Sequence, residues 1–230
     1  MKNTHLSRSA STRLLALFPL CLAAHTASAD ITVSYDSPLV PAGLRPGDSF
    51  HLVFLTSTKV QRDLLDGADD GSDDSTIGQW DAHVNSVADA AAETAIGSVN
   101  WFAVVSLDNL SDGNPGTAAK DHAVVSAPVY RTDGALVAND MADLWDGSLA
   151  VTINLDEDAN PVSGWAWAGG PSYAGDGTIG SQPVGNGTNS ATRGDTSVTT
   201  VHWHGHGGHL VGTPDASEHV YALSERITIE

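Results

Sequence analysis

The segment SFHLVFLTST, from Ser49 to Thr58, is the strongest strand signal in the chain. Its residues are mainly β-branched or aromatic, and its centre is almost wholly apolar. A strand with one face in solvent alternates apolar and polar residues, whereas a strand covered on both faces does not. We therefore predict a strand here that is buried on both faces.

One helix is predicted after this strand. Its apolar residues fall on a single stripe at helical spacing: Ile77, Trp80, Val84, Val87 and Ala91. Thr76 and Gln79 have the spacing of a capping box, in which each residue satisfies a backbone N–H of the other. We predict that the helix begins after Thr76 and ends near Ile96–Gly97.

The rest of the chain has the alternation, turns and loops of a β-rich protein. Strands are predicted at residues 31–35, 99–106, 127–131, 135–138, 149–155, 164–169 and 219–229, with a helical turn at 141–145. The acidic stretch Asp156–Pro161 is predicted to be a turn. Since no internal repeat or linker divides the chain, residues 30–230 are expected to form one α+β domain, mostly antiparallel β with long loops and one main helix.

The first 29 residues have the order of a secretory signal peptide. Three basic residues precede an apolar run of about a dozen residues, and Ala27-Ser28-Ala29 supplies the small residues of a cleavage site. The apolar run is shorter than the roughly 20 residues that span a bilayer. We therefore expect cleavage after Ala29, a secreted or periplasmic protein, and no membrane insertion after cleavage.

Removal of this segment leaves a strongly acidic chain. The remaining residues carry 7 basic and 28 acidic side chains, a formal charge of −21, because the segment holds three of the ten basic residues and no acid. Such a surface disfavours nucleic acid and anionic membranes as partners. Cys21, the one cysteine, lies in the removed segment, so the mature chain has no disulfide or thiolate site.

The densest acidic tract lies between residues 66 and 74. It is predicted to be a surface loop, because buried unpaired carboxylates would lose their hydration. Its side chains form a possible cation loop for calcium: Asp66, Asp69, Asp70, Asp73 and Asp74. Ordinary solvated surface is the alternative for this tract.

Four histidines within eight residues form the sharpest local motif: His202, His204, His206 and His209. On a strand the first three would point the same way, and the intervening glycines would let His209 join them. Neutral imidazoles in that arrangement suit zinc, copper or nickel. Loosely held ions and a plain polar loop are the alternatives. Trp203, placed among the histidines, is predicted to contact a ligand.

The order of elements resembles the C-type-lectin-like and endostatin-like folds. Both have an early buried strand, one long helix, a tryptophan-centred strand, a loop-rich middle and a closing strand. Local sequences carry the likeness further: residues 101–106 and 127–149 resemble endostatin segments, and residues 165–177 resemble its Trp-x-Gly segment and following turn. The resemblance implies a lectin-like or endostatin-like single domain.

The likeness is strongest to secreted bacterial proteins of unknown function, many of which carry an exosortase (PEP-CTERM) sorting tail. They share a segment like Gly47–Thr58 and an ending like Tyr221–Ser224. This chain ends at Glu230 without the tail, so a surface anchor is not expected. It lacks the cysteine pairs of animal domains, and Val184 follows Gln182-Pro183 where calcium-dependent lectins have an acid.

These observations favour a non-enzymatic extracellular binding, matrix or surface module that uses long loops to hold a glycan, a protein or a cation. A metal-dependent hydrolase centred on residues 202–209 is one alternative. A passive structural surface protein is another. No Gly-x-Ser-x-Gly elbow or phosphate-binding loop indicates a different catalytic class.

Overall fold

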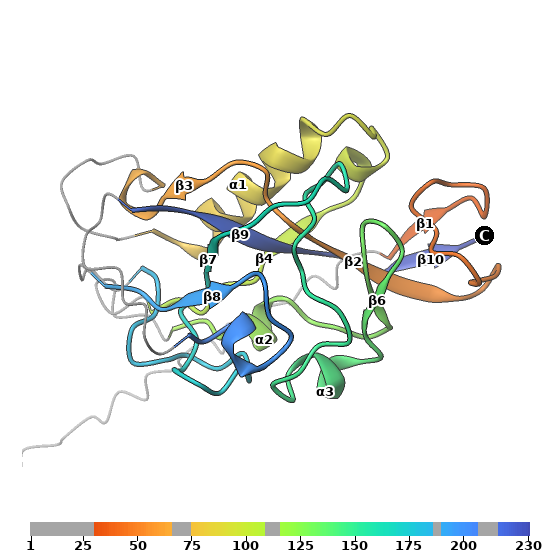
Figure 1. The fold of residues 1–230 in the computed structure, drawn as a ribbon. Coiled ribbons are helices and arrows are strands. Elements are labelled where there is room, and N and C mark those ends of the chain that lie inside the picture. Colours follow the sequence, from red (N-terminus) through yellow and green to blue (C-terminus); the bar gives the residue numbers. More distant parts are fainter. Residues whose placement is uncertain (1–29, 66–74, 109–115, 186–189, 207–215) are drawn as a thin grey trace, which may run out of the picture.

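The computed structural model describes residues 30–65, 75–108, 116–185, 190–206 and 216–230, and shows a mixed α/β chain with a strand-rich sheet and few helices (Figure 1). The strands are β1 (Ile31–Val33), β2 (Ser49–Leu55), β3 (Val60–Gln61), β4 (Trp101–Ala103), β5 (Val129–Arg131), β6 (Leu136–Ala138), β7 (Trp165–Trp167), β8 (Arg193–Asp195), β9 (Ser217–Ser224) and β10 (Ile227–Ile229). The helices are α1 (Ile77–Asp89), α2 (Ala119–His122) and α3 (Met141–Leu144), and the 3₁₀ turns include η1 (Arg62–Leu64), η2 (Ile96–Ser98) and η4 (Val201–Trp203).

Strand β9 is the centre of the sheet. It pairs antiparallel with β2, β3 and β4 and parallel with β7, and the main strand order is β1-β10-β2-β9-β7-β8. Val53 lies opposite Leu223, and Ala166 lies opposite His219. The last segment of the chain therefore pairs with β2, a strand that lies more than 150 residues earlier in the sequence.

Strand β2 is buried on both faces, as the sequence predicts. Phe50, Leu52 and Phe54 pack into one core cluster, whereas Val53 and Leu55 pack into the other. All five side chains are at most 2% exposed. The sheet therefore separates two apolar layers, which explains why this strand has no polar face.

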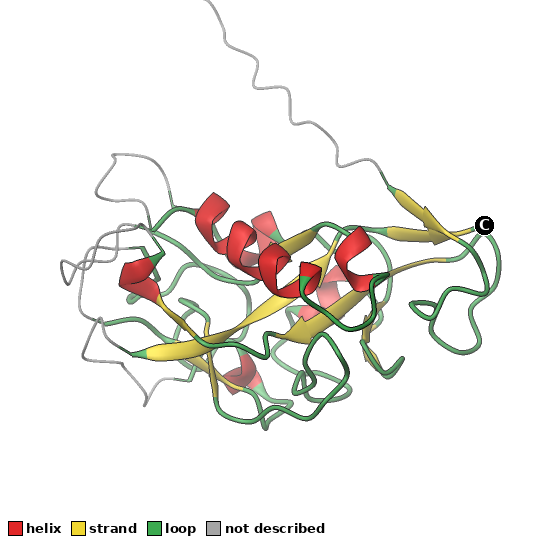
Figure 2. Cartoon of the chain, turned by 90° about the horizontal axis from the view of Figure 1, so that it is seen from above, coloured by secondary structure: helices red, strands yellow, loops and turns green. Residues whose placement is uncertain are grey.

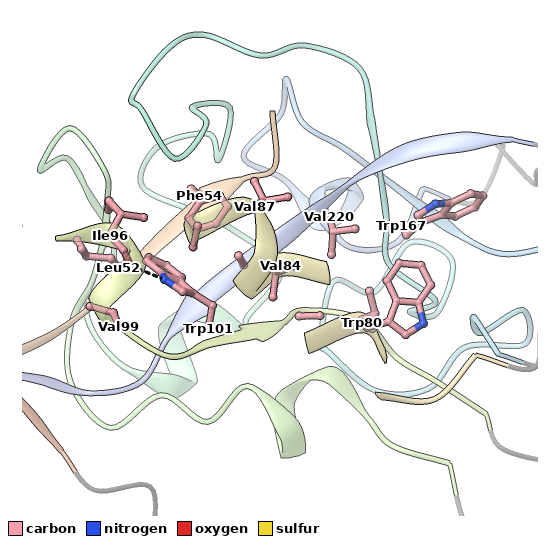
Figure 3. Close-up of a cluster of buried hydrophobic side chains, with 14 of the residues drawn as sticks. Leu52, Phe54, Trp80, Val84, Val87, Ile96, Val99, Trp101, Trp167 and Val220 are labelled. Carbon is pink, nitrogen blue, oxygen red and sulfur yellow. Dashed lines mark hydrogen bonds between the residues drawn. The ribbon is translucent and has the colours of Figure 1, made fainter. Parts of the chain in front are cut away.

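Helix α1 covers the first layer. Trp80, Val84 and Val87 face the sheet, and Figure 3 shows them with residues of β2, β4 and β9. The capping box predicted at Thr76 is present. The predicted end near Ile96–Gly97 is wrong: the helix stops at Asp89, and the chain folds back through η2 (Figure 2).

The second layer lies on the opposite face of the sheet. Figure 1 shows α2 and α3 on this side, away from α1. Leu144, Trp145, Ile153 and Trp203 are buried here against β2 and β9. Because loops rather than a long helix cover this face, it is where the long connections of the chain gather.

Two of the predicted strands differ from the structure. Residues 149–155 form no regular strand, because the amides of Leu149 and Ala150 donate to the separate carbonyls of Thr199 and Val137. The closing segment is two strands, β9 and β10, rather than one. The turn at Asp156–Pro161 is confirmed, with a bridge between Leu155 and Pro161.

Some predictions concern residues that the structure does not describe. They are the signal peptide Met1–Ala29, the five aspartates of the 66–74 tract, and His209. Within the described ranges, no helix is both long and apolar enough to cross a membrane.

Candidate ligand-binding face

One end of the sheet positions the residues that surround the histidine motif. Strand β8 pairs antiparallel with β7, so that Trp165 lies opposite Asp195 and Trp167 opposite Arg193. The amide of His206 donates to the Arg193 carbonyl over 2.8 Å and extends this edge. Backbone pairing therefore places His206 beside β8, the neighbour of the tryptophan strand β7.

Two glycines allow the neighbouring segments to approach so closely. A Cβ atom at Gly194 would lie 1.8 Å from the carbonyl oxygen of Trp203, and one at Gly205 would lie 2.0 Å from that of Pro171. The Gly205 carbonyl accepts from the Tyr173 amide over 2.8 Å. These contacts hold η4 and the loop that contains Pro171 and Tyr173 (the 170s loop) against β8.

Four rings then contact one another in sequence, in a group that we call the aromatic row: Tyr173, His202, His206 and Trp165. The centroids of Tyr173 and His202 are 5.2 Å apart, those of His202 and His206 are 4.7 Å apart, and those of His206 and Trp165 are 5.1 Å apart. Tyr173 is 60% exposed, and the other three side chains are partly exposed. The row therefore reaches from solvent to the edge of the sheet.

A charged group lies at the sheet end of the aromatic row. The Arg193 guanidinium lies over the Trp165 ring, 5.0 Å from its centroid, a cation–π arrangement. Arg193 also forms an ion pair with Glu218, and Lys59 lies 3.5 Å from the other oxygen of that carboxylate. These pairs leave the face with charges of both signs, in contrast to the acidic chain as a whole.

Tyr173 has a strained backbone. Its φ angle is 65°, in the left-handed region that bulky residues rarely adopt. Such a conformation costs about 1–3 kcal/mol and is often found at binding sites. The fold therefore holds an exposed tyrosine in an unfavourable conformation, although a glycine would be easier to accommodate.

His204 does not join the other histidines. It is fully buried, with its ring 5.2 Å from the centroids of both Trp145 and Trp203, and neither ring nitrogen makes a hydrogen bond of normal geometry. Burial lowers the pKa of His204 to about 4, and the nearby Val104 backbone and Asp176 offset only part of this effect. His204 is therefore a neutral core residue beneath the aromatic row.

The structure also places Trp203 in the core, where the sequence suggested a ligand contact. Its side chain is 1% exposed and stacks on Trp145 with centroids 5.2 Å apart. Its role here is to support the turn, while Trp165 and Tyr173 provide the accessible rings. Sequence periodicity did not single out Tyr173, although the surrounding Gly- and Ser-rich loop was itself a signal.

The expected strand geometry of the histidine motif is wrong. Residues Val201–Trp203 form η4, so His202, His204 and His206 do not share a strand face. The structure brings His202 and His206 together and separates His204 from them. Among the described residues, no group of three or more His, Cys, Asp or Glu side chains is arranged to hold a metal ion.

A separate open groove of about 390 Å³ lies beside the 156–161 turn. Its lining combines apolar residues and Thr132 with three carboxylates, those of Glu93, Glu157 and Asp158. Each of these carboxylates accepts a hydrogen bond from the protein: Glu157 from Ser57, Asp158 from the Ala92 amide and Glu93 from the Ala95 amide. These acids therefore fix the local loops.

No protein-family model matches the chain, and the searches of curated proteins and of solved structures gave no match either. The geometry of the aromatic row is therefore the main indication of function.

Proposed function

We propose that this protein is a non-enzymatic extracellular binding module and that its ligand lies on the aromatic row. The observation that carries the proposal is the contact series from exposed Tyr173 through His202 and His206 to Trp165. Aromatic side chains offer a large apolar surface with polar tips, which is the combination used at binding faces. The strained backbone of Tyr173 is a cost that ligand binding would explain.

The charges favour a neutral glycan as the ligand. Arg193 is paired with Glu218, and this ion pair weakens the attraction of its guanidinium for a polyanion. A formal charge of −21 on the mature chain would also repel polyanions at a distance. A sugar, by contrast, can place its C–H face on the rings and its hydroxyls on the imidazole nitrogens and the phenol.

The proposal extends to the fold family and to the location of the protein. We propose a C-type-lectin-like or endostatin-like architecture, consistent with the single main helix and the loop-covered face, and export to the periplasm or beyond after cleavage at Ala29. The proposed function does not include calcium-dependent sugar binding at the usual lectin position. Neither nucleic acid nor membrane insertion belongs to the proposed function.

A glycan-binding assay tests the proposed function. The purified protein is screened against neutral polysaccharides in EDTA, and hits are measured by calorimetry. Tyr173→Ala and Trp165→Ala are expected to lose at least about 1 kcal/mol of binding free energy, roughly a five-fold or larger rise in Kd. Tyr35→Ala, which removes another exposed tyrosine at 50% exposure, is the control and should bind like the wild type.

The two alternatives predict other results. A passive structural protein would bind no glycan, and both ring variants would behave like the wild type. A metal-dependent hydrolase would cleave substrate only with metal bound and would need a third protein ligand beside His202 and His206. The described residues provide no such third ligand, whereas the exposed rings of the aromatic row favour the binding module.

A further inference from the structure

We infer that His202 and His206 form a two-histidine site for a late transition-metal ion. Their rings are the closest ring pair in the aromatic row, with centroids 4.7 Å apart and planes inclined at 40°. Each ring comes from a backbone segment that the fold fixes: Trp203 in η4 donates to the Thr200 carbonyl over 2.9 Å, and His206 donates to Arg193. The two imidazoles are therefore held together before any ligand binds.

An unsatisfied polar atom supports this assignment. The Nδ1 atom of His202 is shielded from solvent and has no hydrogen-bond partner. A buried polar atom without a partner destabilises the fold, because it has lost its hydrogen bonds to water. A metal ion bound between the imidazoles would draw on such ring nitrogens, and Arg193, which lies over Trp165 at the end of the row, is paired with Glu218.

The ligand type selects the class of metal. Imidazole nitrogens suit copper, nickel and zinc, whereas calcium and magnesium require oxygen ligands. With only two nitrogen ligands, affinity should follow the general order in which Cu²⁺ binds most tightly. His204 is excluded because its ring is buried in the core, where it packs against both Trp145 and Trp203. Solvent or a bound ligand would complete the coordination.

This metal site goes beyond the proposed glycan binding and does not depend on it. Glycan binding is measured in EDTA, and metal binding is measured without glycan. A protein that binds copper but no sugar would disprove only the proposed function. A protein that binds sugar but no copper would disprove only the metal site.

The test is a Cu²⁺ titration of tag-free protein by calorimetry, with electron paramagnetic resonance to count the bound nitrogens. His202→Gln and His206→Gln remove each imidazole but keep a polar side chain of similar length. His83→Gln, on helix α1, is the matched control, because His83 lies outside the row. Circular dichroism confirms that each variant is folded.

We expect the wild type to bind one Cu²⁺ with two nitrogen ligands. Each row variant should bind more than about ten-fold more weakly, since loss of a direct ligand should exceed the ten-fold minimum seen for outer-shell partners. His83→Gln should match the wild type. Wild-type affinity in either row variant, or no stoichiometric copper in the wild type, would overturn the assignment.

Discussion

His204 lies in a different environment from His202 and His206, although one residue separates it from each. Its burial against two indoles keeps the ring neutral, because the charged form would lose its hydration there. The rings of His202 and His206 are partly exposed and belong to the aromatic row, whereas the ring of His204 packs in the core. At the scale of single residues, solvent access therefore divides one histidine-rich motif into two roles.

The burial of His204 predicts that the free energy of unfolding depends on pH. The pKa of His204 is about 4 in the folded protein, whereas an exposed histidine has a pKa of 6.5. The unfolded chain therefore binds the proton more readily. The contribution of a neutral His204 is complete above pH 6.5 and is lost as the pH falls towards 4, by up to about 3 kcal/mol. Urea unfolding at pH 7.5 and 4.5 measures this loss.

His204→Phe is the matched variant for that experiment. It keeps a ring packed against Trp145 and Trp203 but cannot be protonated, so it should lose less stability than the wild type between the two pH values. At pH 7.5 it should be about as stable as the wild type or more so, since two unsatisfied buried nitrogens are removed. Equal losses in both proteins would show that His204 does not cause the pH dependence.

The strained backbone of Tyr173 predicts that one substitution can preserve the free energy of unfolding while it weakens glycan binding. Tyr173→Gly relieves the left-handed strain and removes a side chain that is 60% exposed. The free energy of unfolding should stay the same or rise by up to about 1 kcal/mol, while glycan binding is lost. Thermal unfolding and calorimetry measure the two effects. A clear loss of stability would mean that the ring mainly supports the fold.

At the scale of elements, the aromatic row depends on the contact between η4 and β8. Gly194→Ala should disrupt this contact, because the new Cβ would lie 1.8 Å from the backbone oxygen of Trp203. A backbone atom, unlike the end of a flexible side chain, cannot move aside by rotation. We expect a loss of about 1–3 kcal/mol, as in other overpacked sites. Urea unfolding measures the change.

Gly78→Ala is the control for this substitution. Gly78 lies in the first turn of α1, and a Cβ there would meet nothing within 4 Å. The change should stabilise the protein by up to about 1 kcal/mol, because alanine favours helix over glycine. If both variants had the same stability, the η4–β8 contact would not be tight in solution.

Elements with a long apolar pattern were predictable from the sequence. Strand β2 follows from its continuous apolar run and helix α1 from its helical periodicity, because in both cases the burial of a residue depends on the pattern of its own element. The histidine turn was not predictable in this way. Trp203 and His204 are consecutive and both buried, which no strand alternation allows, and their position depends on Gly194 and on the 170s loop.

At the scale of the whole molecule, the sheet separates two layers with different tasks. Helix α1 closes one face with a continuous apolar core, whereas loops and short helices cover the other (Figure 1). Binding residues are commonly found on loops that a rigid scaffold holds in place. Here β7, β8 and β9 are that scaffold, and Tyr173 and His202 lie on the loops beside them.

The most direct test of the binding face is to follow the six tryptophan indole N–H signals by nuclear magnetic resonance while adding a neutral glycan that the protein binds. The indoles of Trp80 and Trp101 lie on the α1 side of the sheet, and Trp165 lies in the aromatic row. We predict that the Trp165 signal shifts with ligand concentration while those of Trp80 and Trp101 stay in place. Saturable binding that leaves Trp165 unchanged would contradict the proposed face.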